Sequence, residues 1–369
     1  MKTLAIIGST GSIGNSAIKV FLKNKKKFNL VLLATNSNYR SLLKQKKICN
    51  PKNILLFDKL LSNKIKNKKL ISEEFFFKRN KKKIDYVISG VSGYASIDIN
   101  FKLLNISKNL LLANKETIVC GGKTFLKLAK KKKCKIVPID SEHHCIDFFL
   151  KSFVLKKEIK KYFITASGGP FLEKKIIYNE KISNVLNHPT WKMGKKISVD
   201  SSTFANKILE LFEAQILFDI PKKDLKILIE KTSNIHSIIK LNNNIYIPII
   251  HKANMQLTIS NCLNVKNNFD LRIDNLNFSL TKPNLLKFPL VTLGYKILND
   301  YCAKGMIIFT VLNERLVKMF LEGKIKYGEI SFNLVKAFKK KEIIKVSKQN
   351  TINLNDIKKT ILYANKIKL

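Results

Sequence analysis

The chain has 369 residues, of which 45% are hydrophobic, and a formal net charge of +43. This length and apolar content suffice for two or three globular domains with buried cores. Such a charge often marks a nucleic-acid or anionic-membrane partner. However, arginine, the residue best suited to base reading, occurs only at 40, 79, 272 and 315, and the lysines are spread over the whole chain. We therefore interpret the lysines as solvated helix ends and loops, and expect neither partner.

Cysteine usage and the lack of long apolar runs bear on localisation. The six cysteines show neither CxxC pairing nor the density of a disulfide scaffold. The apolar stretch at residues 4–7 stops at Gly8, too early for a signal peptide. No apolar run approaches the ~18 residues of a membrane-spanning helix. We expect a reduced, cytoplasmic protein.

The first 139 residues alternate short apolar runs with helix-compatible segments, which predicts βαβ units on a parallel sheet and a Rossmann-type domain. The expected strands are 4–7, 30–34, 54–57, 86–88, 110–113 and 136–139.

The pattern of apolar and polar residues changes after residue 139. Residues 140–263 mix strand-like and helix-like segments, which predicts a central α+β domain. Residues 264–288 are polar and end near two prolines, as a linker does. Residues 289–369 carry apolar residues at helical spacing, which predicts a small C-terminal helical domain. The fold class is therefore α/β at the N-terminus, followed by α+β and helical parts.

A glycine-rich turn, Gly8-Ser-Thr-Gly11-Ser-Ile-Gly14, follows the first expected strand directly. Glycines there let the backbone approach a pyrophosphate at a helix N-terminus. The spacing departs from GxGxxG, so a plain turn is the alternative. No acidic residue follows the second strand; residues 34–38 are uncharged and Arg40 is near, which favours NADP over NAD.

Two carboxylates, Asp140 and Glu142, follow the last expected strand of the sheet. If the backbone there is extended, both side chains point to one side, and oxygen ligands of this kind suit Mg²⁺ or Mn²⁺. A solvated loop is the alternative. A third carboxylate, Glu210, lies on an expected helix at 201–213 with hydroxyl caps at its start.

On that helix Asn206, Lys207 and Glu210 share one face. A surface ion pair between Lys207 and Glu210 is the alternative interpretation. The turn Ser167-Gly-Gly-Pro170 offers amides and a hydroxyl that suit phosphate oxygens, although turn chemistry alone explains it equally well. The loop with His188 and the only tryptophan, Trp191, is either a docking element or a lid.

Together these segments resemble one family. GSTGSIG, LLANKET (111–117), VPIDSEH (137–143), TASGGPF (165–171), NHPTWKMGKKISVDS (187–201) and NKILELFEA (206–214) resemble, in order and spacing, the signature segments of 1-deoxy-D-xylulose 5-phosphate reductoisomerases. The match spans about residues 1–237. The chain departs from the family's pattern at 230–233 and at 254–258, in a region that in the family belongs to the sheet that supports dimerisation.

The resemblance implies NADPH and one divalent cation, Mg²⁺ or Mn²⁺, as cofactors, and a homodimer. It implies metal ligands at Asp140, Glu142 and Glu210, which with Lys207 and His188 form the catalytic set. The implied substrate-binding residues are Ser141, Ser167, His188, Trp191, Ser201, Asn206 and Lys207, with His188, Trp191 and Met193 on a flap. The implied NADPH-binding residues are Thr10, Gly11, Ser12, Ile13, Asn36, Ser37, Asn38, Asn114, Lys115, Glu116 and Gly194.

The implied reaction rearranges 1-deoxy-D-xylulose 5-phosphate and reduces the product with NADPH to 2-C-methyl-D-erythritol 4-phosphate, in the non-mevalonate route to isoprenoid precursors. Lys207 is expected to meet the substrate phosphate. Two alternatives remain: another Rossmann-type NADP-dependent semialdehyde reductase, which has no need of the paired acidic motifs, and a catalytically dead basic RNA-binding protein.

Overall fold

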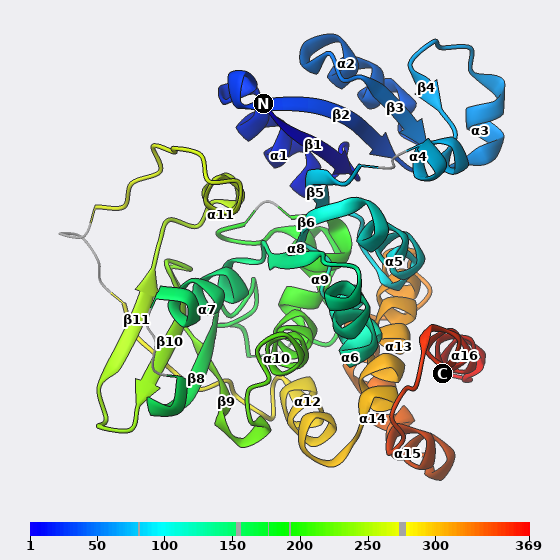
Figure 1. The fold of residues 1–369 in the computed structure, drawn as a ribbon. Coiled ribbons are helices and arrows are strands. Elements are labelled where there is room, and N and C mark those ends of the chain that lie inside the picture. The colour runs from blue at the N-terminus through cyan, green and yellow to red at the C-terminus, as the bar shows by residue number, and fades with distance from the viewer. Residues whose placement is uncertain (80–81, 153–155, 176, 192, 273–277) are drawn as a thin grey trace. The chain divides into compact units, whose positions relative to one another are not determined.

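The computed structural model describes residues 1–79, 82–152, 156–175, 177–191, 193–272 and 278–369. The chain forms two compact units, which Figure 1 shows as ribbons. The first contains residues 1–114, 125–144 and 254–269, and the second contains 115–124, 145–253 and 270–369. The domain boundaries expected at 139, 263 and 288 stay predictions. Part of the expected linker, 273–277, lies outside the described residues.

A seven-stranded parallel sheet forms the centre of the first unit, in the order β4-β3-β2-β1-β5-β6-β7. The direction of the strand order therefore reverses between β1 and β5, where open α/β sheets bind ligands. The predicted Rossmann-type sheet is confirmed. The strand β4 (Leu70–Ile71) was not predicted, because two residues are too few to show a periodic pattern. The strands are β1 (Lys2–Ile7), β2 (Phe28–Thr35), β3 (Asn53–Leu56), β4 (Leu70–Ile71), β5 (Ile84–Ser89), β6 (Ser107–Leu112) and β7 (Lys135–Pro138).

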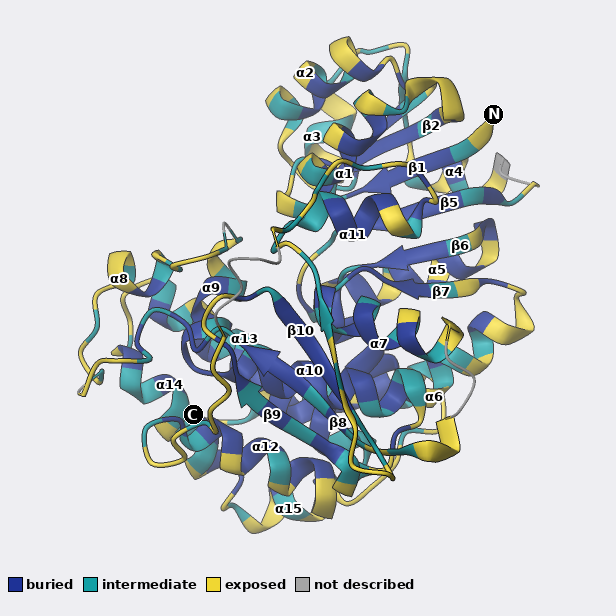
Figure 2. Ribbon diagram, turned by 90° about the vertical axis from the view of Figure 1, so that its left-hand side faces the viewer, coloured by how far each residue is buried: buried dark blue, intermediate teal, exposed yellow. Residues whose placement is uncertain are grey.

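The sheet residues are apolar because both faces are covered. Leu4, Ile6, Leu33 and Ile88 are fully buried in one cluster, which Ile259 joins; Figure 2 shows these strands as largely buried. The helices of this unit are α1 (Ser12–Lys23), α2 (Tyr39–Cys49), α3 (Lys59–Lys64), α4 (Glu73–Arg79), α5 (Ile97–Ile106) and α11 (Met255–Cys262). Helices α6 (Lys115–Lys131) and α7 (Ser141–Ser152) contribute residues to both units.

The second unit contains a four-stranded sheet in the order β11-β10-β8-β9. Strands β8 (Ile159–Ala166) and β9 (Leu225–Ile229) are parallel, whereas β10 (Ile235–Leu241) is antiparallel to β8 and to β11 (Tyr246–Ile250). The α+β character expected for this region is confirmed. The remaining helices are α8 (Ile182–Leu186), α9 (Lys195–Ser202), α10 (Ala205–Phe218), α12 (Pro289–Asp300), α13 (Ala303–Leu321), α14 (Tyr327–Ala337), α15 (Lys341–Ser347) and α16 (Leu354–Lys366).

Helix α10 is the central helix of the second unit. Ten of its fourteen residues are buried. Helix α12 approaches it so closely that a Cβ on Gly294 would stand 2.3 Å from Cδ1 of Ile208. A helix buried on nearly all sides holds its polar residues in fixed positions, which matters for Asn206, Lys207 and Glu210.

The helical C-terminal part is confirmed by α12 to α16. None of the six cysteines is in a disulfide. Among the described residues, no helix combines the length and the apolar character that a membrane crossing requires.

Candidate active site

The glycine-rich turn joins β1 to α1 in the first unit. Gly8 has a φ of 76°, and a Cβ there would stand 2.9 Å from the carbonyl carbon of Gly90, which follows β5. A Cβ on Gly14 would stand 2.2 Å from the carbonyl oxygen of Gly8. The turn therefore requires glycine at both positions. Helix α1 begins at Ser12 behind Gly11, which has no side chain to cap it, so this helix N-terminus suits an anion.

The other expected cofactor residues of the first unit lie near this turn or follow neighbouring strands. The hydroxyls of Thr10 and Thr35 are 2.6 Å apart, which joins the turn to the end of β2. Asn38 caps α2 by accepting from the Ser41 amide, and residues 36–37 precede it. Asn114 follows β6 and donates to the Gly93 carbonyl.

The condition of an extended backbone through Asp140 and Glu142 is not met. Asp140 follows β7, but α7 begins at Ser141, so Glu142 lies in the first helical turn. A carboxylate there is favoured by the partial positive charge of the helix N-terminus. The two side chains still converge, since one oxygen of each lies within 4.8 Å of the other. Asp140 also contacts Nδ1 of the buried His143 at 3.3 Å, and Ser141 donates to Glu142.

Glu210 is buried on α10 among nitrogen donors and cations. Asn206 donates to its Oε1 at 2.6 Å, and the Lys207 ammonium lies 2.5 Å from Oε2. Lys115, at the start of α6, contributes a second ammonium at 3.6 Å. The predicted shared face of Asn206, Lys207 and Glu210 is confirmed. The surface ion pair is wrong, because both side chains of that pair are less than a tenth exposed.

The predicted hydroxyl caps of this helix are also wrong. Ser201 and Ser202 belong to the end of α9, and α10 begins only at Ala205. Phe204, in the left-handed region with a φ of 65°, separates the two helices. Ser202 and Thr203 donate back to the carbonyl of Val199. The sharp turn at Phe204 gives no pattern in the sequence, since aromatic residues rarely adopt this conformation.

Two predicted substrate residues, Ser167 and His188, are in direct contact. The Ser167 Oγ is 3.0 Å from the His188 Nε2. His188 Nδ1 accepts from the amides of Thr190 and Trp191, so in the neutral ring the proton sits on Nε2 and is donated to Ser167. Burial lowers the pKa of His188 to about 4, which keeps the ring neutral at physiological pH.

The backbone at Gly169 lies close to the backbone of Ser201. Gly169 has a φ of 68°, and a Cβ on it would stand 3.2 Å from the Ser201 carbonyl oxygen. Its amide donates to the Ser167 Oγ at 3.3 Å. Since that hydroxyl already accepts from Gly169 and His188, its own proton is available to a further acceptor such as a phosphate oxygen. Gly194 stands directly before α9.

A buried ionic network in the second unit was not predicted. Lys196 contacts both Glu116 and, at 2.7 Å, Asp200, and Asn313 on α13 donates to Asp200 at 2.7 Å. Burial lowers the pKa of Lys196, but the charges of Asp200 and Glu116 outweigh it and hold that pKa above its usual value. The i,i+4 spacing of Lys196 and Asp200 was the available sequence signal.

Burial and neighbouring charges also have opposing effects on the pKa values of Glu116 and Asp200. Burial raises the pKa of Glu116, yet Lys196 outweighs it and the pKa is lowered. The pKa of Asp200 is raised, because burial there outweighs its contact with Lys196 and Glu116 repels its charge. The network therefore holds Glu116 ionised.

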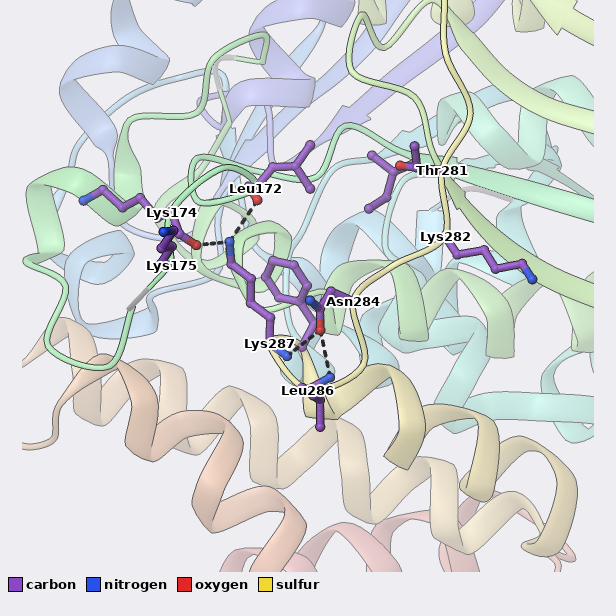
Figure 3. A pocket seen from close by; sticks show the side chains of 10 residues that line it. Leu172, Lys174, Lys175, Thr281, Lys282, Asn284, Leu286 and Lys287 are labelled. Carbon is purple, nitrogen blue, oxygen red and sulfur yellow. Dashed lines mark hydrogen bonds between the residues drawn. The ribbon is translucent and has the colours of Figure 1, made fainter.

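A pocket of about 520 Å³ in the second unit contains none of the predicted site residues. Figure 3 shows Lys287 closing one wall by donating to the carbonyls of Leu172 and Lys174. Lys174 and Lys282 extend away on opposite sides. This pocket is therefore not part of the candidate active site, which consists of the predicted residues.

Comparison with known proteins decides the family. A family model described as 1-deoxy-D-xylulose 5-phosphate reductoisomerase matches residues 4–122, and models of its C-terminal domains match 136–218 and 250–365. A Pelagibacter ubique protein named 1-deoxy-D-xylulose 5-phosphate reductoisomerase is 37% identical over 97% of this chain and 96% of its own length. The chain belongs to the 1-deoxy-D-xylulose 5-phosphate reductoisomerase family. A Clostridium kluyveri reductoisomerase is 34% identical over 92% of each chain.

Solved structures of reductoisomerases share the fold. A crystal structure of a DOX-P reductoisomerase in complex with NADPH, fosmidomycin and magnesium has a TM-score of 0.90 and 27% identity, and covers 99% of this chain and 97% of that one. The Zymomonas mobilis reductoisomerase in complex with NADPH has a TM-score of 0.85 and 25% identity, with 98% and 97% covered. The predicted family and fold are confirmed.

Proposed function

We propose that this chain rearranges 1-deoxy-D-xylulose 5-phosphate and reduces the product to 2-C-methyl-D-erythritol 4-phosphate with NADPH and one divalent cation. Membership of the reductoisomerase family over nearly the full length is the observation that carries this proposal. The relatives and solved structures reported above are all named reductoisomerases, and they favour neither the semialdehyde reductase nor the RNA-binding alternative.

Ser167, Ser201 and His188 form the phosphate-binding part of the proposed site. The Ser167 hydroxyl has a proton to donate, and the neutral His188 ring holds it in place. A neutral ring adds a hydrogen bond without a second positive charge, so the charge that meets the phosphate comes from Lys207. That ammonium is fixed by Glu210 at 2.5 Å, which orients it before the substrate arrives.

Asp140, Glu142 and Glu210 are the proposed metal ligands. The residues present fit a hard cation, because all three are carboxylates and the first two have oxygens within 4.8 Å of each other. A bound Mg²⁺ or Mn²⁺ supplies Lewis-acid polarisation of the substrate's carbonyl and hydroxyl oxygens. Asn206 orients Glu210 through its 2.6 Å hydrogen bond, as partners of metal ligands commonly do.

NADPH fits the glycine turn of the first unit. Side chains at Gly8 and Gly14 would collide with neighbouring backbone atoms, so only glycines allow this tight turn. The turn leads into the N-terminus of α1, where Gly11 provides no side-chain cap and the backbone amides suit a pyrophosphate. Thr10, Gly11, Ser12 and Ile13 are proposed to line the pyrophosphate. Residues 36–38, 114–116 and Gly194 are proposed for the rest of the cofactor. The uncharged turn after β2 leaves room for a 2′-phosphate.

A second copy of the chain is the proposed partner. Strand β11 is an edge of its sheet, and Ile245 and Tyr246 beside and on it are each more than half exposed. An exposed edge of this kind is a template for pairing with another strand, which supports a homodimer. The cytoplasm is the proposed location, in keeping with six cysteines outside any disulfide.

The test is NADPH oxidation, followed at its absorbance, with 1-deoxy-D-xylulose 5-phosphate as substrate. We expect turnover with Mg²⁺ or Mn²⁺, none after chelation, and recovery when metal is returned. Steady NADPH oxidation without the sugar phosphate, or turnover that survives chelation, would contradict the proposal. Salt-sensitive RNA binding without turnover would favour the basic binding protein instead.

A further inference from the structure

Two histidine rings stack on each other in the sheet of the second unit. His236 lies on β10, and His251 directly follows the neighbouring strand β11. Their ring centroids are 3.8 Å apart, with 21° between the planes. The His236 Nε2 faces the His251 carbonyl at 3.1 Å, so in the neutral ring it carries the proton and donates. The stack and this hydrogen bond fix the orientation of the His236 ring.

The Trp191 indole stands edge-on to the same His236 ring. Their centroids are 6.3 Å apart and their planes are inclined by 67°, within the range of favourable aromatic pairs. Within the described part of the second unit, the loop of residues 187–191 thus contacts two other segments: His188 contacts Ser167, which follows β8, and Trp191 contacts His236 on β10. The Trp191 amide also donates to His188 at 3.0 Å, so a displacement of the tryptophan disturbs the histidine.

We propose that His236, held by its stack on His251, is a positioning residue that seats Trp191 and thereby keeps His188 in place for substrate. This inference rests on the proposed function, which assigns His188 to substrate binding. A loop that is already ordered loses less conformational freedom when substrate binds. The packing of Trp191 against His236 therefore lowers KM for the substrate and leaves the chemical step unaffected.

Trp191 is the only tryptophan of the chain, so protein fluorescence on selective tryptophan excitation reports this loop alone. The experiment measures acrylamide quenching of that emission in the full chain, without substrate or NADPH. His251→Ala removes the stacked ring from a partly exposed position outside the buried core, and His251→Phe, the matched control, keeps a flat ring. His236→Ala removes the ring against which Trp191 packs.

We expect His251→Ala and His236→Ala to raise the quenching constant at least twofold, and His251→Phe to resemble the unmodified chain. In turnover, KM for the sugar phosphate should rise about fivefold in the two alanine variants, as the loss of one aromatic pair implies, with kcat within about twofold. A merely structural role would instead lower the active fraction, and so kcat, at constant KM.

Unchanged quenching in His251→Ala would overturn the proposal, even if His236→Ala fails to fold. So would an equal defect in His251→Phe, because stacking would then not be the cause. The quenching arm needs no substrate. If the unmodified chain shows no turnover, the proposed function is contradicted. The fluorescence measurement still decides separately whether His236 and His251 hold Trp191 in place.

Discussion

Lys196 and Glu116, 80 residues apart in the chain, form an ion pair in the second unit. Glu116 stands next to Lys115, which contacts Glu210, while Lys196 lies on α9, the helix that carries Ser201. The Lys196 ammonium thus joins a segment that we propose binds NADPH to a helix that we propose binds substrate. Asp200 and Asn313 extend this connection to α13.

Lys196→Met should strongly destabilise the second unit. It removes the ammonium from two carboxylates, Glu116 and Asp200, whose side chains are 8% and 1% exposed. Breaking a buried pair by removing one partner costs about 3–5 kcal/mol. The measurement is the free energy of unfolding from denaturant titration. Lys324→Met is the control, because its ion pair with Glu322 lies at the surface, and its unfolding should be unchanged. Equal effects of the two substitutions would contradict the network's role.

His188 should titrate far below the usual range for histidine. Burial lowers its pKa from 6.5 to about 4. The unfolded chain therefore takes up this proton first as the pH falls, so the stability that the neutral ring contributes is complete above pH 6.5 and is lost progressively towards pH 4. NMR titration of the ring protons, assigned through His188→Asn, gives the midpoint. A midpoint between 6 and 7 would show that the ring is not buried as described.

Gly14→Ala should disrupt the turn between β1 and α1. Its Cβ would stand 2.2 Å from the Gly8 oxygen and 2.5 Å from backbone atoms of Ser9, none of which can rotate away. We expect a loss of about 1–3 kcal/mol in stability and at least tenfold weaker NADPH binding, followed by cofactor fluorescence. Gly194→Ala is the control for folding, because no atom lies within 4 Å of its Cβ position. Normal NADPH affinity in Gly14→Ala would argue against the turn as the pyrophosphate site.

The parallel sheet was predictable because its strands are short apolar runs at regular spacing. What the sequence does not reveal is local and conformational. Strand β4 has two residues and no period. The start of α7 at Ser141 was missed, because a strand leading directly into a helix leaves no loop signal. The left-handed Phe204 divides α9 from α10 in a segment that reads as one helix.

The site was predictable where its residues share one helix face, as Asn206, Lys207 and Glu210 do. Contacts between distant segments, such as Lys115 with Glu210, leave no periodic trace. The family departure at residues 230–233 is accommodated locally: Glu230 is buried and accepts hydrogen bonds from Thr232, Asn234 and Ile235. A carboxylate here stabilises its own turn, which only the structure could reveal.

The proposed function depends most on the binding of one cation by the proposed ligands Asp140, Glu142 and Glu210. Its most direct test is Mn²⁺ binding followed by electron paramagnetic resonance, in the unmodified chain and in Asp140→Asn, Glu142→Gln and Glu210→Gln. We predict one tight site in the unmodified chain, at least tenfold weaker binding and loss of turnover in each variant, and NADPH affinity within twofold. Asp147→Asn, on the same helix as Glu142, should bind Mn²⁺ normally. Unchanged Mn²⁺ affinity in Glu210→Gln, or full activity in any of the three variants, would contradict the assignment.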